Sequence, residues 1–202
     1  MFYRVNPAKG NHIGIPRYLV RDEIDGVAYP YKGIEEVLSG KIDPEGIMGN
    51  GSLQSFILSD IFTFLLKNLD RNEYTLLPNI WHQISEETNL TYALGVWRKS
   101  MLPPDSISNG PATTAPSIAI EVDERVDCKS SSFEAYRQKK VESFFQSGGE
   151  RLVWVNLDPK LVYVFRQAKA LEEFKWAEHF EITSGLSFCI EKELNRQGIT
   201  FE

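Results

Sequence analysis

The sequence is poor in cysteine, histidine and long hydrophobic runs, and each scarcity excludes a class of protein. Two cysteines and three histidines occur among 202 residues. They are too few for a disulfide framework and lack the spacing of a zinc site. The longest apolar stretch, within residues 56–66, is broken by Ser59, Asp60 and Thr63, so no membrane span is expected. The first residues lack the apolar run of a signal peptide, and we therefore expect a cytoplasmic protein.

Positive charge is also in short supply. The chain has 22 Lys and Arg against 28 Asp and Glu, a formal net charge of −6. Nonspecific affinity for nucleic acid comes mainly from Lys and Arg on phosphates, so the overall charge does not by itself indicate a nucleic-acid binder. The length and the 42% hydrophobic content fit one globular domain. We predict an irregular N-terminal arm over residues 1–17 and a single domain over 18–202.

The pattern of apolar residues predicts a mixed β-sheet flanked by helices, an α/β (α+β) fold. Apolar residues at helical spacing predict helices over residues 52–69 and 132–147, the second ended by Gly148-Gly149. Alternating and apolar runs predict strands over 74–77, 80–84 and 92–97 and within 116–125, with Pro78 interrupting the first two. Two further strands flank the turn at Asp158-Pro159. One or two short strands are expected within 174–194.

The segment PSIAIEVDER, residues 116–125, places two acids inside an apolar strand pattern. Side chains alternate across a strand, so Glu121 and Asp123 share one face. Their carboxylates then stand roughly 7 Å apart, close enough to bind one divalent cation. Buried charges are costly unless they are paired or bind a metal. The alternative is an edge strand whose polar face meets water.

The second helix carries a lysine on its apolar side. That side is formed by Phe133, Tyr136, Val141, Phe144 and Phe145. At about 100° per residue, Lys140 falls near the middle of this stripe and Arg137 lies close by. A lysine in such a position either extends along its stem to water or meets a buried acid. Because the helix follows the acidic strand, Lys140 or Arg137 could meet those acids, as a structural salt bridge or as part of a hydrolytic site.

These segments together resemble a known family. The acidic strand IEVDE and the downstream run KVESFFQSGGERLVWVNLDP, with EIDGVAYPYKGIEEVLSGK and EGIMGNGSLQSFILSDIFTFL upstream, are similar to the Uma-two-type restriction endonucleases. These bacterial proteins are a branch of the PD-(D/E)XK nuclease superfamily. The resemblance covers about residues 18–190. It implies a restriction-endonuclease-like core, a carboxylate site for Mg²⁺ or Mn²⁺, DNA as a partner and a homodimer.

The resemblance also assigns roles to residues of this chain. Glu121 matches the strand glutamate expected to bind metal, and Lys140 matches the helix lysine of many members. Glu23 matches an N-terminal acid near the site. Arg125 replaces a lysine of related members.

Two positions depart from the pattern that the resemblance implies. Ala93 stands where the family has an aspartate, and Asp123 stands where the superfamily motif has a lysine. Asp123 could substitute for the lost ligand. The sequence therefore predicts a metal-dependent DNA endonuclease in which Glu121, Asp123 and Lys140 are catalytic and Glu23, Arg125 and Arg137 are secondary. The alternative is a catalytically inactive nuclease-fold protein that acts as a DNA- or protein-binding homodimer. A third interpretation is a purely structural cluster of salt bridges.

Overall fold

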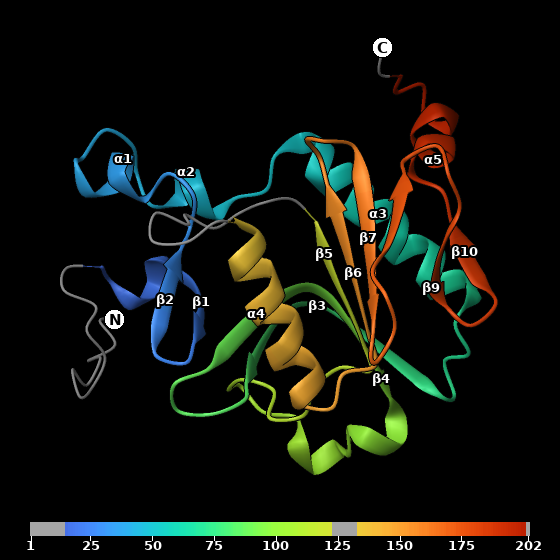
Figure 1. The fold of residues 1–202 in the computed structure, drawn as a ribbon, viewed down its shortest axis with the longest axis horizontal. Helices are drawn as coiled ribbons and strands as arrows, with labels where there is room; N and C mark the ends of the chain where they lie inside the picture. Colours follow the sequence, from blue (N-terminus) through green and yellow to red (C-terminus); the bar gives the residue numbers. More distant parts are fainter. Residues whose placement is uncertain (1–14, 123–132, 201–202) are drawn as a thin grey trace.

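A mixed β-sheet with helices on both faces forms the core of the protein (Figure 1), in agreement with the fold predicted from the sequence. The computed structural model describes residues 15–122 and 133–200. Its main sheet contains β1 (Val20–Ile24), β2 (Val27–Pro30), β3 (Tyr74–Gln83), β4 (Asn89–Arg98), β5 (Ile118–Val122), β6 (Arg151–Asn156), β7 (Leu161–Arg166) and β8 (Glu172–Lys175). A separate pair is formed by β9 (Phe180–Thr183) and β10 (Leu186–Phe188). The helices are α1 (Ile34–Leu38), α2 (Glu45–Met48), α3 (Ser52–Asn68), α4 (Phe133–Gln146) and α5 (Ile190–Arg196), with short 3-10 turns at Arg17–Leu19, Lys99–Met101 and Pro104–Ser106.

The strand order is β2-β1-β4-β5-β6-β7-β8, with β3 paired to β4. β5 and β6 run parallel, and the chain between them contains α4. The predicted hairpin at Asp158-Pro159 is confirmed as the antiparallel pair β6–β7, and the turn at Asp25-Gly26 joins β1 and β2. The sequence missed α5, which packs on α3. No helix within the described part of the chain is both long and apolar enough to cross a membrane.

Strand β5 separates two hydrophobic cores. Ile118, Ile120 and Val122 pack on the α3 side, whereas Ala119 belongs to the core under α4. All five residues of β5 are buried, and the strand lies between β4 and β6. The interpretation of an edge strand with its acids in water is therefore wrong, because a strand covered on both faces leaves Glu121 no access to solvent.

Two strands, β1 and β5, pair with the same edge of β4 at different points along its length. β3 pairs along the whole length of β4, so β1 and β5 must both use the opposite edge. β1 pairs with it at Asn89 and β5 pairs with it from Leu94 to Val96, which leaves residues 90–93 between them. The sheet therefore forks at this point, and the fork lies next to α4, which contacts both β1 and β6.

The β3–β4 ribbon changes face beside the fork. Tyr92 belongs to the core under α4 but Leu94, two residues later, belongs to the core under α3. Asn79, which by register stands opposite Ala93, has a left-handed backbone with φ 51°. The predicted break in the strand at Pro78 is therefore wrong, because β3 is continuous and an edge strand tolerates proline. Instead of a break, the ribbon changes the face that it turns to each core next to Pro78.

Candidate functional site

Lys140 of α4 is the centre of a buried polar cluster at the fork. Its side chain is 0% exposed. Its Nζ donates to Asp22 Oδ2 at 2.9 Å, to the carbonyl oxygen of Thr91 at 2.6 Å, and to Glu121 Oε1. A lysine ammonium has three N–H donors and no acceptor, so all three donors are used. The lysine on the apolar stripe therefore meets acids from two different strands.

Asp22 of β1 accepts hydrogen bonds on both carboxylate oxygens. Thr91 donates to Oδ1 through its backbone N–H at 2.6 Å and its hydroxyl at 3.1 Å. Oδ2 accepts from Lys140 and from the hydroxyl of Tyr136. Since a carboxylate offers about four lone-pair sites, Asp22 is saturated. Burial alone would raise the pKa of Asp22, but Lys140, Arg21 and the hydrogen bond from Tyr136 hold that pKa below its usual range.

Glu121 of β5 lies between two cations. Its carboxylate is held by Lys140 through Oε1 and by Arg21 Nη2 through Oε2, the latter at 2.6 Å. Among the described residues these two cations take two of the roughly four lone-pair sites of Glu121, whereas all four sites of Asp22 are taken. Burial lowers the pKa of Arg21, but the nearby charges of Glu121 and Asp22 outweigh this and raise the pKa above its ordinary value. Arg21 is thus a permanent cation on Glu121.

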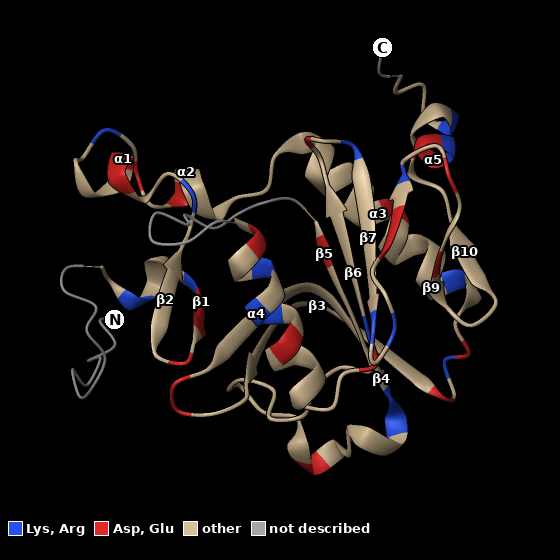
Figure 2. Ribbon diagram, in the orientation of Figure 1, with Lys and Arg blue, Asp and Glu red and all other residues tan. Residues whose placement is uncertain are grey.

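The cluster balances its own charge. Asp22 and Glu121 contribute two negative charges, and Arg21 and Lys140 contribute two positive charges. A buried ion pair is tolerated only when it is compensated in this way. Figure 2 marks the acidic residue within β5 and the basic residues along α4. Three aromatic rings surround Lys140 Nζ at centroid distances of 5.3–6.0 Å, those of Tyr92, Trp154 and Tyr136, and they add cation–π attraction.

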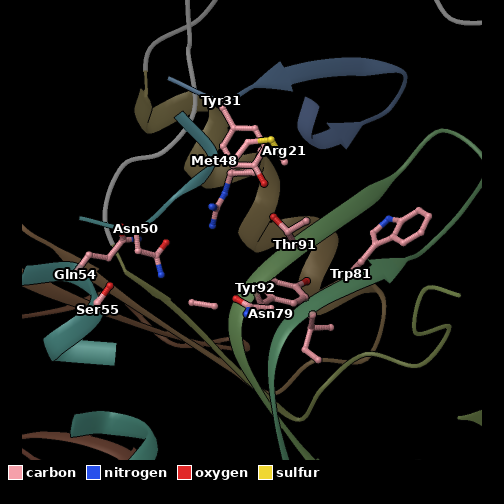
Figure 3. A pocket seen from close by; sticks show the side chains of 12 residues that line it. Arg21, Tyr31, Met48, Asn50, Gln54, Ser55, Asn79, Trp81, Thr91 and Tyr92 are labelled. Carbon is pink, nitrogen blue, oxygen red and sulfur yellow. The ribbon is translucent and has the colours of Figure 1, made fainter. Parts of the chain in front are cut away.

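A cleft of about 460 Å³ opens beside the cluster (Figure 3). Arg21 lies at this cleft, with Thr91 and the β3–β4 ribbon on one side and Asn50 and Gln54 on the other. The described residues that line it are Arg21, Tyr31, Met48, Asn50, Gln54, Ser55, Asn79, Ile80, Trp81, Thr91, Tyr92 and Ala93. None of them is acidic. Ala93 is part of this wall, at the position where the resembled family has an aspartate.

The other predicted site residues lie elsewhere or outside the described residues. Glu23 forms an ion pair with Arg17 at 2.8 Å and does not join the cluster. Arg137, expected near the acids, lies over the ring of Tyr163 at 4.2 Å from its centroid, because its side chain turns toward β7. Asp123 and Arg125 lie outside the described residues.

The structure brings Asp22 of β1 into the Lys140 cluster, whereas the sequence analysis named Glu23, and the sequence held a signal for Asp22. Asp22 and Ile24 are both buried, whereas Glu23 between them faces the other way. A period of two anchored on the apolar Ile24 places Asp22 on the core side. Arg21 and Thr91 carried no comparable signal, because they reach the cluster through contacts between distant parts of the chain.

The cluster contains the ligand type that a hard divalent cation prefers, carboxylate oxygen. The described residues leave Glu121 lone pairs that could bind such an ion, and Arg21 already places a positive charge on its Oε2. Asp22 does not fit as a ligand, because its lone pairs are taken. Among residues 15–122 and 133–200, no three His, Cys, Asp or Glu side chains gather into a group that could hold a metal. A metal at this place would therefore depend on Glu121 and on ligands beyond these residues.

No protein-family model matches the chain, and no curated protein is significantly similar to it. The solved structures that are similar to the chain include that of a protein from Anabaena variabilis described as a "putative nuclease" belonging to DUF820, which is similar over most of its length. The identity is 14%, the alignment covers 91% of this chain and 94% of the other, and the TM-score is 0.63. The likeness shows that this chain shares the fold of that protein.

Proposed function

We propose that the protein is a metal-dependent nuclease that hydrolyses DNA phosphodiester bonds at the Lys140 cluster. One observation carries the proposal: a fully buried lysine is held between carboxylates of β1 and β5 at the fork of the sheet, next to a cleft. Buried lysines are rare without a reason, and titratable groups gathered beside a cleft are typical of active sites. The shared fold with a protein described as a "putative nuclease" supports the same reading.

Each residue then has a distinct role. Glu121, together with Asp123, would hold Mg²⁺ or Mn²⁺. Such a cation, when bound, neutralises charge on the phosphate and activates water. Lys140 adds a fixed positive charge that stabilises the negative charge developing on the phosphate. Asp22 positions Lys140 by fixing its Nζ, and Tyr136 and Thr91 fix Asp22 in turn.

The test is the nicking of supercoiled DNA with Mg²⁺, with Mn²⁺ and with EDTA. We expect activity that needs a divalent cation and that falls roughly a hundredfold or more in Glu121→Gln, the scale of losing one group that stabilises the transition state. Glu23→Gln is the matched control, since this neighbouring acid pairs with Arg17 outside the cluster. Thermal melts establish that each variant is folded. Activity that is indifferent to both metal and Glu121 would refute the proposal.

A second candidate is a catalytically inactive nuclease-fold protein that binds DNA or protein as a homodimer. Ala93 in the cleft wall favours it, as does the guanidinium of Arg21 on Glu121. Calorimetric titration with Mn²⁺ separates the two candidates. Binding of Mn²⁺ that disappears in Glu121→Gln favours the nuclease, whereas DNA binding without any metal binding favours the inactive protein. Sedimentation analysis tests the homodimer.

A further inference from the structure

We infer that Gln54 of α3 is a positioning residue, which fixes the end of β5 and with it the carboxylate of Glu121 at the fork of the sheet. This role deepens the proposed function by naming a further residue that prepares the same site, and it therefore rests on that function. Three features of the molecule support it: the length over which β5 is paired, the bond that Gln54 donates, and the burial of Gln54.

β5 is paired over different lengths on its two sides. β6 pairs with it from Ile118 to Val122, whereas β4 pairs with it from Ile118 to Ile120. Glu121 and Val122 therefore extend past the last of the pairs with β4, into the fork. A strand that loses one neighbour is held less firmly at that point, and its buried backbone groups need other partners.

The side chain of Gln54 supplies one such partner. Its Nε2 donates to the carbonyl oxygen of Val122 at 2.7 Å, although the two residues are 68 apart in the chain. Thr91, on the β4 side of the fork, is held in a similar way, since its carbonyl oxygen accepts from Lys140 and its N–H donates to Asp22. Side chains thus replace the strand pairing that β4 and β5 lose where they separate.

Gln54 is a polar residue on the apolar side of its helix. It is 4% exposed, and the other buried residues of α3 are Ile57, Ile61 and Leu65. A buried amide is costly unless it is hydrogen-bonded, so the bond to Val122 accounts for its presence there. Figure 3 shows Gln54 on the α3 side of the cleft and Arg21 on the β1 side. Gln54 therefore stands where the fork meets the cleft.

A fixed carbonyl of Val122 also fixes Glu121, the residue before it. One rigid peptide unit joins the two α-carbons, and the Glu121 carboxylate must reach both Arg21, at 2.6 Å, and Lys140. Groups that orient a metal ligand without touching the metal typically change metal affinity or activity about 10–100-fold when they are lost. Loss of the Gln54 bond should therefore loosen the geometry of Glu121 and leave its charge in place.

Gln54→Met tests this role, because methionine keeps the length of the side chain and removes the donor. Hydrogen exchange of the β5 amides, followed by NMR in EDTA, reports on the strand itself. We expect exchange about tenfold faster in the variant, the scale of one buried hydrogen bond, and unchanged exchange in β7. Calorimetry should show Mn²⁺ binding weakened about tenfold. Nicking assays should show a lower kcat with KM within about twofold.

Two substitutions on the same helix are the controls. Asn68→Leu removes an amide donor of the same kind, which bonds the carbonyl oxygen of Phe64 at 2.7 Å on the exposed end of α3. Ile61→Val lowers stability through the core and keeps the bond to Val122. Gln54→Glu adds a rescue, because its carboxyl group can donate to Val122 only when protonated. Its β5 exchange, relative to the wild type at each pH, should recover as the pH falls from about 8 to about 5.

The role of Gln54 is overturned if β5 exchange is unchanged in Gln54→Met, or if Ile61→Val weakens Mn²⁺ binding as much as Gln54→Met does. A wild type that neither binds Mn²⁺ nor cleaves DNA overturns the proposed function instead, and the exchange measurements still decide whether Gln54 fixes β5. Metal-dependent cleavage together with unaltered β5 exchange in Gln54→Met does the reverse.

Discussion

Replacing Lys140 by methionine removes the charge at the centre of the cluster and keeps the length of the side chain. Asp22 and Glu121, both buried, are then left with Arg21 as their remaining cation. Breaking a buried ion pair from one side typically costs about 3–5 kcal/mol, because a buried charge is left without compensation. For a chain of this length that loss lowers Tm by about 6–20 °C. It is a large part of the roughly 5–15 kcal/mol that stabilises an ordinary domain.

The assay is thermal unfolding at pH 7 in EDTA, followed by circular dichroism. Lys139→Met is the matched control, because Lys139 is the exposed neighbour of Lys140 on the same helix. We expect the control to change the free energy of unfolding by no more than about 0.5 kcal/mol. If Lys140→Met lowers Tm by less than about 2 °C, the assignment of Lys140 as the buried partner of both acids is refuted.

The pH dependence of the same experiment identifies the cause. Lys140 helps to hold the pKa of Asp22 below its usual range, so in the wild type this carboxylate contributes stability that is lost only as the pH falls through its lowered pKa. Without Lys140 the pKa of Asp22 rises, and the acid can shed its charge under milder acid. The difference in Tm between wild type and variant should therefore narrow from pH 7 toward pH 4. If the difference in Tm stays constant with pH, the stability lost in Lys140→Met comes from packing and not from the charge of Asp22.

Three further substitutions test other parts of the structure. Burial lowers the pKa of His82 from 6.5 to about 4, so the stability of the neutral ring is complete above pH 6.5 and is lost as the pH falls toward 4; His82→Leu should flatten the fall of Tm in that window. Gly149→Ala places a methyl group onto the ring of Phe144, and we expect a loss of about 1–3 kcal/mol in urea unfolding; full stability would mean that the ring has room to move. Ala93→Asp places a carboxylate in the cleft wall, and calorimetry should show tighter Mn²⁺ binding, because the new carboxylate adds an oxygen ligand beside the cluster; unchanged Mn²⁺ binding would separate Ala93 from the site.

The faces of β5 and α4 were predictable from the sequence because they follow local periodicity. Alternation along β5 places Ile120 toward one core and Glu121 toward the other, and the helical period of α4 turns Lys140 inward. Both rules depend on neighbours within a few residues of one another. Asp22 was within reach of the same rule, applied from the buried Ile24.

The rest of the site depends on contacts between segments far apart in the chain. Arg21 and Glu121 are separated by 100 residues, and Asp22 and Thr91 by 69. They meet because β1 and β5 share one edge of β4, a pairing that no local pattern reports. The change of face at Ala93 likewise arises where two strands pair, so the sequence could show that an aspartate is missing there but not that Ala93 lines a cleft.

Ala93 and Arg21 both line the cleft beside the cluster. A cluster present for stability alone has little reason to include ions, since well-packed apolar residues often serve as well or better. Here the second cation, Arg21, lines the cleft and holds one oxygen of Glu121, and none of the described residues in the cleft wall is acidic. Arg21 is thereby held in a fixed orientation by a buried acid, with 9% of its side chain exposed. If Glu121 binds a metal as proposed, the same carboxylate also orients Arg21, so the affinity for the metal must depend on the Arg21–Glu121 ion pair.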